Sequence, residues 1–396
     1  MTQSEEMIES IHIQNFKSIY DLNITLGRVN LFIGENGSGK SNLLEALVFV
    51  SAGQSNKLDN EFLVSRGLRV PEPQLMRSAF DEESKDKDIE ISINLDKKLR
   101  KINFVHNNQE YSTWQRKEEN IIDKDNLKDF MSFLEENKQN LQNKGHTGEI
   151  KKAKDNLYNM QITFKNVSKN IFESLMPTIQ NFLIYSPENT ALRTFEKEGQ
   201  IQPLGINGEG LLKLLKVINN YQDKSYIQTI IESLQLFDWF EDITIPSKEN
   251  IENHVIIKDK YLYREIDQRS ANEGFLFILF YITLIVAKET PKAFAIDNID
   301  ASLNPKLCTK LMTIICDLAK KYDKQIFLTT HNPAILDGID LNDEEQKLFV
   351  VSRNKSGHTR MKNITAKDKP KSSNDEPLKL SEAFLRGYLG GLPKGF

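Results

Sequence analysis

Cysteine is nearly absent from this sequence: Cys308 and Cys316 are the only two among 396 residues. Their spacing fits neither a zinc site nor a disulfide framework, which excludes a small fold stabilised by either. A long hydrophobic run is also missing, because the longest, Phe275–Ala287, is shorter than the roughly 20 residues that a membrane helix needs. The first residues, Met1–Glu6, are polar and acidic and do not resemble a signal peptide. We therefore expect a cytoplasmic protein with no membrane contact.

Neither sign of charge dominates the composition. The chain has 52 Lys and Arg residues against 56 Asp and Glu residues, for a net charge of −4. Such a balance gives no overall basic field of the kind that draws a protein to nucleic acid. Binding of DNA to a local basic groove is still compatible with the sequence. The length is sufficient for one large α/β domain with an inserted segment.

The most informative segment that is present is Gly34–Ser41, with the sequence GENGSGKS. It follows an apolar run that is typical of a strand, Val29–Ile33, and precedes a helical pattern, which is the setting of a phosphate-binding loop. Its glycines let backbone N–H groups turn toward an anion, and the next helix adds its positive end. Lys40 would reach the β- and γ-phosphates of ATP, and the Ser41 hydroxyl would bind Mg²⁺. The predicted nucleotide-binding residues of this loop are Asn36, Gly37, Ser38, Gly39, Lys40 and Ser41.

Two later strands end in residues that suit the second half of a nucleotide site. The apolar run Ala293–Ile296 ends at Asp297, whose carboxylate would hold Mg²⁺ together with Ser41. Ile326–Thr330 is followed by His331, which would sense the γ-phosphate or the attacking water. Ligands of α/β proteins bind at the carboxyl ends of strands, so both positions fit, although a capping aspartate and a turn histidine have the same pattern. The predicted catalytic residues are Asp297, Asn298, Asp300 and His331.

A polar segment, Ser270–Gly274, precedes the long apolar helix expected from Phe275. A polar pair and a glycine at a helix start can bind an anion, but an ordinary helix cap has the same pattern. The place of this segment between the phosphate loop and Asp297 favours a role in the nucleotide site.

The rest of the chain divides into segments of different character. Residues 53–80 are expected to be irregular. The inserted segment at 120–177 has apolar residues at helical spacing and is predicted to be a helical hairpin. This hairpin would be either a packed lid or a contact for a partner or DNA. After it, strands and helices alternate, which indicates a mostly parallel sheet. A polar linker then leads to a last helix near Ser381. The predicted segments are a first lobe at 1–119, the hairpin at 120–177, a second lobe at 178–365, and a linker and tail at 366–396.

The motifs come in an order that resembles the ABC-type ATPases of the RecF, SMC and OLD group. The order is Ile11–Ser18, the phosphate loop, Asn272–Gly274, the Asp297 strand and Thr329–Pro333. The resemblance implies an α/β ATPase head with a mixed, mostly parallel sheet and an inserted helical hairpin. It also implies a head-to-tail homodimer or higher oligomer in which Asn272, Glu273 and Gly274 touch the ATP held by a second subunit. A side chain at Gly274 would push that phosphate away, and the loop Ala301–Asn304 would cross the dimer.

Two residues depart from the pattern of that group. Asn272 stands where the group usually has serine, and Asn298 stands where it usually has a glutamate that polarises the attacking water. A neutral amide can orient water but cannot take a proton. We therefore expect ATP binding with slow hydrolysis, unless Asp300 substitutes for the missing glutamate.

Features that other members of that group have and this sequence lacks reduce the number of candidate functions. The chain has no long heptad arm and no Cys-x-x-Cys hook, and only about 44 residues follow residue 352, so we expect no nuclease domain of the OLD type. Compact heads of this kind resemble the ATPase subunits of bacterial anti-phage systems such as PARIS and Septu. The resemblance implies a sensor or scaffold that controls a separate nuclease or toxin. A DNA-acting ATPase of recombination or repair, like RecF, is the alternative, and a transporter ATPase subunit is a more distant one.

Overall fold

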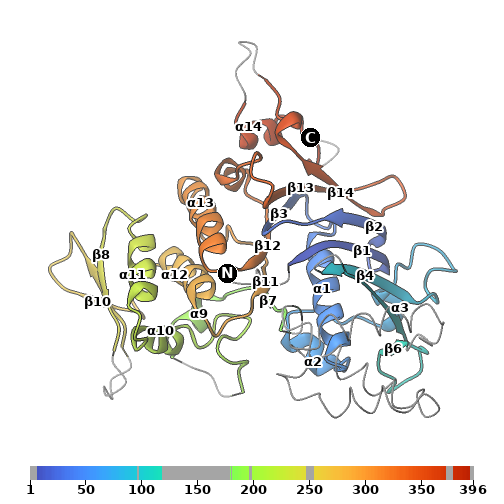
Figure 1. The fold of residues 1–396 in the computed structure, drawn as a ribbon, viewed down its shortest axis with the longest axis horizontal. Helices are drawn as coiled ribbons and strands as arrows, with labels where there is room; N and C mark the ends of the chain where they lie inside the picture. The colour runs from blue at the N-terminus through green and yellow to red at the C-terminus, as the bar shows by residue number, and fades with distance from the viewer. Residues whose placement is uncertain are drawn as a thin grey trace, which may run out of the picture.

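A six-stranded mixed sheet forms the centre of the molecule (Figure 1). The computed structural model describes residues 7–95, 98–117, 179, 181–195, 199–246, 254–371 and 378–392. Neighbouring strands of the sheet are parallel, except that the edge strand β14 is antiparallel to β13. In spatial order the strands are β14 (Thr359–Ile364), β13 (Gln346–Arg353), β3 (Val29–Gly34), β12 (Gln325–Thr330), β11 (Ala293–Ile296) and β7 (Ile184–Tyr185). The predicted mixed, mostly parallel sheet is confirmed.

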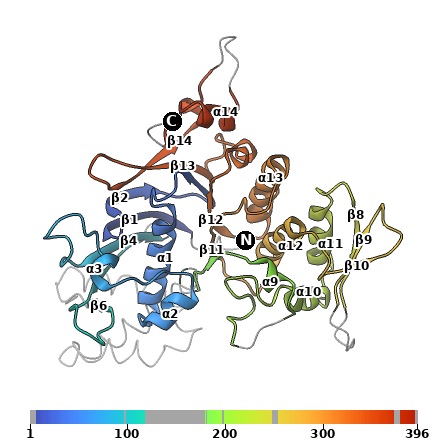
Figure 2. The same ribbon diagram turned by 180° about the vertical axis from the view of Figure 1, so that it is seen from behind.

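Every residue of β3, β11 and β12 is buried, because helices cover both faces of the sheet. Alternate side chains of these strands enter two different hydrophobic cores. In β3, Leu31 and Ile33 join the core of α12 (Glu273–Val286) and α13 (Pro305–Lys321), whereas Phe32 joins the core of α1 (Lys40–Gln54). Figures 1 and 2 show α1 on one side of the sheet and α12 and α13 on the other.

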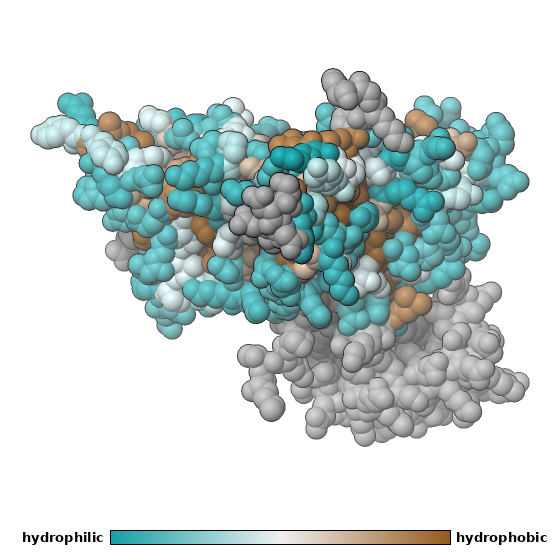
Figure 3. Space-filling model, turned by 90° about the horizontal axis from the view of Figure 1, so that it is seen from above, coloured by the Kyte–Doolittle hydropathy of each residue, from teal (hydrophilic) through white to brown (hydrophobic). Residues whose placement is uncertain are grey.

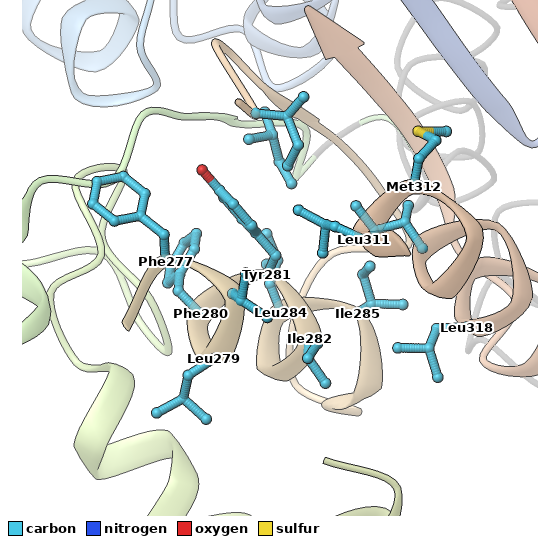
Figure 4. Packing of buried hydrophobic residues seen from close by; sticks show 14 of the residues in the cluster. Phe277, Leu279, Phe280, Tyr281, Ile282, Leu284, Ile285, Leu311, Met312 and Leu318 are labelled. Carbon is cyan, nitrogen blue, oxygen red and sulfur yellow. The ribbon is translucent and has the colours of Figure 1, made fainter. Parts of the chain in front are cut away.

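The two helices on the second face differ in pattern. The apolar helix expected from Phe275 is α12, and its side chains are buried from Gly274 to Val286 because it lies inside the core. Helix α13 is amphipathic and begins with Asn304 as its N-cap and Pro305 in its first turn, an arrangement that fixes its start. Figure 4 shows Tyr281 and Ile285 of α12 packed toward Leu311 of α13.

Two antiparallel sheets flank the central one. A five-stranded sheet lies beside α1 and shares its core, and the alternation of buried residues along β1 marks its inner face. Its strands are β2 (Ile19–Thr25), β1 (Ile8–Phe16), β4 (Ile89–Leu95), β5 (Lys98–Val105) and β6 (Gln115–Lys117). A three-stranded sheet lies at the far end of the other lobe, with β10 (Ile266–Asp267), β9 (Ile256–Asp259) and β8 (Phe240–Thr244).

One expectation about the helical segments was wrong. Residues 53–80, expected to be irregular, contain two short helices, because Asp59 caps the first and Pro73 starts the second. The helix expected near Ser381 is present. The predicted hairpin at 120–177 lies outside the described residues. The bounds are α2 (Asn60–Ser65), α3 (Pro73–Met76), α9 (Asn189–Leu192), α10 (Leu211–Asn219), α11 (Ser225–Leu234), η1 (Pro333–Gly338), η2 (Ala366–Asp368) and α14 (Leu380–Leu385).

Hydrophilic side chains cover most of the face seen in Figure 3, and apolar side chains show only in patches between them. Among the described residues, no helix combines the length and the apolar character that a membrane crossing requires.

Candidate nucleotide site

The phosphate-binding loop joins the end of β3 to the start of α1 at the centre of the sheet. Gly37 and Gly39 have φ angles of 75° and 105°, a region that side-chain-bearing residues rarely adopt, so glycine is required at both turns. The Lys40 ammonium is 2.9 Å from the Gly34 carbonyl and 3.0 Å from the Glu35 carbonyl. It therefore lies across the loop, where the β- and γ-phosphates of a nucleotide would lie.

Lys40 is a buried cation with acidic neighbours. Burial lowers its pKa, while the nearby charges of Asp297, Asp300 and Glu35 act in the opposite direction. A positive charge with little water around it attracts an anion more strongly than one in bulk solvent. The loop thus offers a cation, a helix N-terminus and glycine-rich backbone at one point.

Ser41 and Asp297 come together although they are far apart in the sequence. The Ser41 hydroxyl lies 3.1 Å and 3.3 Å from the two carboxylate oxygens of Asp297, and the Thr329 hydroxyl also donates to that carboxylate. Hydroxyl and carboxylate oxygens are ligands that suit Mg²⁺. Within the described part of the chain, no cluster of three or more His, Cys, Asp or Glu could hold a metal alone. Ser41 and Asp297 would therefore hold Mg²⁺ jointly with phosphate oxygens and water.

Asp300 and His331 form a second pair at the same edge of the sheet. One oxygen of Asp300 accepts hydrogen bonds from the Thr330 hydroxyl at 2.7 Å and from the His331 backbone N–H at 3.2 Å. Through these two bonds, Asp300 connects the segment after β11 to Thr330 and His331 at the end of β12. Partial burial, helped by the charge of Lys40, lowers the pKa of His331, and the carboxylates of Asp297 and Asp300 only partly offset this. A lowered pKa favours the uncharged imidazole, which can act as a hydrogen-bonding group.

Asn298 is exposed beside Asp297 and has an unusual backbone conformation. Its φ angle is 57°, in the left-handed region that asparagine tolerates better than most residues. Its N–H donates to the Thr329 hydroxyl at 2.9 Å. The amide thus suits the backbone at this position, whereas a glutamate there would be strained.

Asn272, Glu273 and Gly274 make their contacts away from the Asp297 cluster. Asn272 caps α12 by accepting a hydrogen bond from the Phe275 N–H at 3.3 Å. The Ser302 hydroxyl donates to Glu273 at 2.8 Å, and a Cβ atom at Gly274 would lie 3.0 Å from the Ser302 carbonyl. Glycine is therefore favoured here by packing within the chain as well as by the expected phosphate. The start of α12 and the loop Ala301–Asn304 meet at this point.

Sequence reasoning missed three residues that hold these parts in place. Thr329 and Thr330 donate hydrogen bonds to the two site carboxylates, and their sequence signal is their place in the Thr329–Pro333 motif at the end of an apolar strand. Arg193 donates to three backbone carbonyls of the segment before Asn272, at 3.0, 2.6 and 2.9 Å. Nothing in the sequence around Arg193 distinguishes it from other surface arginines. The three carbonyls belong to Gln268, Arg269 and Ala271.

A phosphate-binding loop on a central parallel strand, with Asp297 and His331 after two neighbouring strands, defines the P-loop ATPases. Comparison with known proteins agrees with this class. The solved structure of an SMC head bound to the C-winged helix domain of ScpA matches with a TM-score of 0.54 and 14% identity, covering 91% of this chain and 98% of that one. That likeness supports an SMC-head-like α/β fold.

Two curated relatives from the RecF, SMC and OLD group of ABC-type ATPases are similar to this chain. The OLD nuclease of Thermus scotoductus is 19% identical over 354 residues, which are 84% of this chain and 60% of that protein. RecF of Porphyromonas gingivalis is 38% identical over 82 residues, which are 20% of this chain and 22% of RecF. The chain spans less than two thirds of the length of the curated relatives it matches.

The family is shown by a profile that matches residues 29–337. The chain belongs to the family described as "AAA domain, putative AbiEii toxin, Type IV TA system". The match includes the phosphate loop, the start of α12, Asp297 and His331.

Proposed function

We propose that this chain binds Mg-ATP, pairs with a second copy around the nucleotide and hydrolyses it slowly. The observation that carries the proposal is the cluster at the carboxyl edge of the sheet, where the Ser41 hydroxyl meets the Asp297 carboxylate next to the charge of Lys40. Lys40 would bind the β- and γ-phosphates, and Ser41 with Asp297 would hold the metal. Mg²⁺ would neutralise phosphate charge during hydrolysis.

Pairing is supported by the position of Asn272 and Gly274 beside the loop Ala301–Asn304. The helix N-terminus capped by Asn272 is suited to bind an anion. A second copy would place this helix end over the γ-phosphate, so each ATP would lie between two chains. The resemblance to RecF, SMC and OLD proteins supports the same arrangement.

We further infer that the ATP-bound pair is a long-lived state that controls a separate effector, a nuclease or toxin, in anti-phage defence. Asn298 supports the slow step because its amide cannot accept the proton of the attacking water. The description of the family names a toxin, which fits an ATPase that works with a harmful partner. Asp300 is the less favoured base, since its hydrogen bonds to Thr330 and His331 give it a positioning role.

Asn298→Glu is expected to raise the rate of ATP hydrolysis by about 10²-fold, because it places a general base beside Asp297. The gain is limited by the left-handed backbone, which costs a glutamate about 1 kcal/mol or more. Steady-state phosphate release measures the change. Asn298→Gln, which lengthens the side chain but keeps a neutral amide, is the matched control and should leave the rate near that of the parent. Parent-like rates in both Asn298→Glu and Asp300→Asn would show that neither residue governs the reaction.

A DNA-acting ATPase is a second candidate because of one observation on residues 353–371, which run from the end of β13 through β14 and η2. Residues 353–371 contain seven Lys and Arg residues, all exposed, and a single acidic residue. Phosphate contacts by such residues make DNA affinity fall steeply with salt. Titration of labelled duplex DNA at two salt concentrations separates the candidates. Effector control predicts no salt-sensitive binding, whereas binding that disappears in Lys355→Glu with Arg360→Glu would favour the DNA-acting function.

A further inference from the structure

The hairpin formed by β13 and β14 contacts the outer side of the phosphate loop (Figure 1). Arg353, the last residue of β13, donates from Nε to the Gly37 carbonyl at 2.7 Å. Thr359, the first residue of β14, donates from its hydroxyl to the Ser38 carbonyl at 2.9 Å. Two successive carbonyls of the loop are thus held by one hairpin that is more than 300 residues away in the sequence.

The Thr359 hydroxyl belongs to a chain of hydrogen bonds with one possible direction. Asn42 of α1 donates from its side-chain nitrogen to the Ser18 hydroxyl at 2.6 Å, and the Ser18 and Thr359 hydroxyls are 2.7 Å apart. An amide nitrogen can only donate and a carbonyl can only accept. The Ser18 hydroxyl therefore donates to the Thr359 hydroxyl, which in turn donates to the Ser38 carbonyl. Ser18, Ser38 and Thr359 are at most 6% exposed, so water cannot easily replace a lost partner.

Holding these carbonyls also orients the N–H groups of the loop. In a trans peptide, the C=O of one residue and the N–H of the next point in opposite directions. With the Gly37 and Ser38 carbonyls turned to the hairpin, the N–H groups of Ser38 and Gly39 turn to the opposite side. That side is the one that a phosphate would occupy, and the Ser38 N–H already points across the loop to the Glu35 carbonyl at 3.3 Å.

The fit between the loop and the hairpin is close. A methyl group at Gly39 would overlap the Thr359 hydroxyl and approach the Ser18 hydroxyl at 2.8 Å. The backbone of the loop therefore rests directly on the Thr359 side chain. Both hairpin residues lie outside the segment, 29–337, that matches the family profile.

We propose that Arg353 and Thr359 are positioning residues of the nucleotide site: the β13–β14 hairpin orients the N–H groups of the phosphate loop before a nucleotide binds. This inference rests on the proposed binding of ATP. Its consequence is that polyphosphate affinity depends on two side chains that touch no phosphate. Orientation before binding strengthens affinity because the loop has less freedom left to lose.

The test measures dissociation constants of Mg-ATP and of inorganic triphosphate by calorimetry. Thr359→Val should weaken both ligands by about tenfold, the effect of losing roughly one hydrogen bond that orients the loop. Thr359→Ser keeps the hydroxyl and should bind within about twofold of the parent. Arg353→Gln should also weaken both ligands, and because Arg353 is exposed, its unfolding temperature without nucleotide should not change. Arg360→Gln, an exposed change on the same hairpin, is the matched control and should have no effect.

The outcomes separate the inference from the proposed function. If the parent protein binds neither ligand, the proposed function itself is wrong. If the parent binds both, and Thr359→Val and Arg353→Gln bind with parental affinity, the positioning role is wrong while the function stands. Equal losses in Thr359→Val and Thr359→Ser, or a loss for ATP without a loss for triphosphate, would also overturn the inference.

Discussion

Lys40→Ala should weaken binding of Mg-ATP by about 10²–10³-fold, the effect of removing one partner from a buried charge pair. The Lys40 side chain is only 5% exposed, and its ammonium lies across the loop that would hold the phosphates. With alanine there, the phosphates would keep the backbone N–H groups but lose the cation in the loop. Calorimetric titration with Mg-ATP measures the loss.

Lys57→Ala is the control for this experiment, since Lys57 is exposed and lies beyond the end of α1. Its affinity for Mg-ATP should equal that of the parent. The unfolding temperature of each variant without nucleotide checks that the loop has kept its fold. A folded Lys40→Ala protein that binds ATP as tightly as the parent would remove the basis for placing the nucleotide at this loop.

Asn272→Asp is expected to abolish ATP-dependent pairing while leaving ATP binding to a single chain intact. Aspartate caps a helix as well as asparagine does, so α12 should keep its start. In the pair, however, the new carboxylate would face the phosphates held by the second copy. Two unit charges 4 Å apart near a protein surface repel by about 4 kcal/mol, enough to weaken pairing by more than about 100-fold.

Asn272→Ser is the matched control, because serine is also a good cap and adds no charge. Light scattering with Mg-ATP should show pairing for the parent and for Asn272→Ser, and single chains for Asn272→Asp. Pairing of Asn272→Asp at parental strength would mean that the start of α12 does not face a phosphate in the assembly.

Local patterns in the sequence were sufficient to predict much of the fold, and they also supply the prediction for the centre of the candidate site. The strands at 293–296 and 326–330 are continuous apolar runs because they lie inside a covered parallel sheet, and that burial is visible in the residue types themselves. The phosphate loop combines glycines with lysine at fixed spacing, so this short segment is sufficient to predict a nucleotide-binding loop. The expected common edge for Asp297 and His331 follows from parallel strands alone.

Other features depend on contacts that no local pattern records. The short helices at 60–65 and 73–76 lie in a segment with mixed polarity, where caps rather than periodicity set the structure. The contacts of Arg193, Arg353 and Thr359 join distant segments, and one arginine or threonine in a sequence is indistinguishable from another. The left-handed backbone of Asn298 is likewise visible only in three dimensions. This backbone conformation is a structural reason for asparagine at position 298, in addition to the proposed effect of its amide on hydrolysis.

The central claim is that each ATP lies between the phosphate loop of one chain and the start of α12 of another. The most direct test mixes equal amounts of Lys40→Ala and Asn272→Asp with Mg-ATP, since each variant supplies the half-site that the other lacks. Each variant alone should stay at the chain mass of 45.6 kDa. The mixture should contain a species of about twice that mass, with one intact composite site. If the parent pairs with Mg-ATP while the mixture stays at the mass of a single chain, the shared site is contradicted.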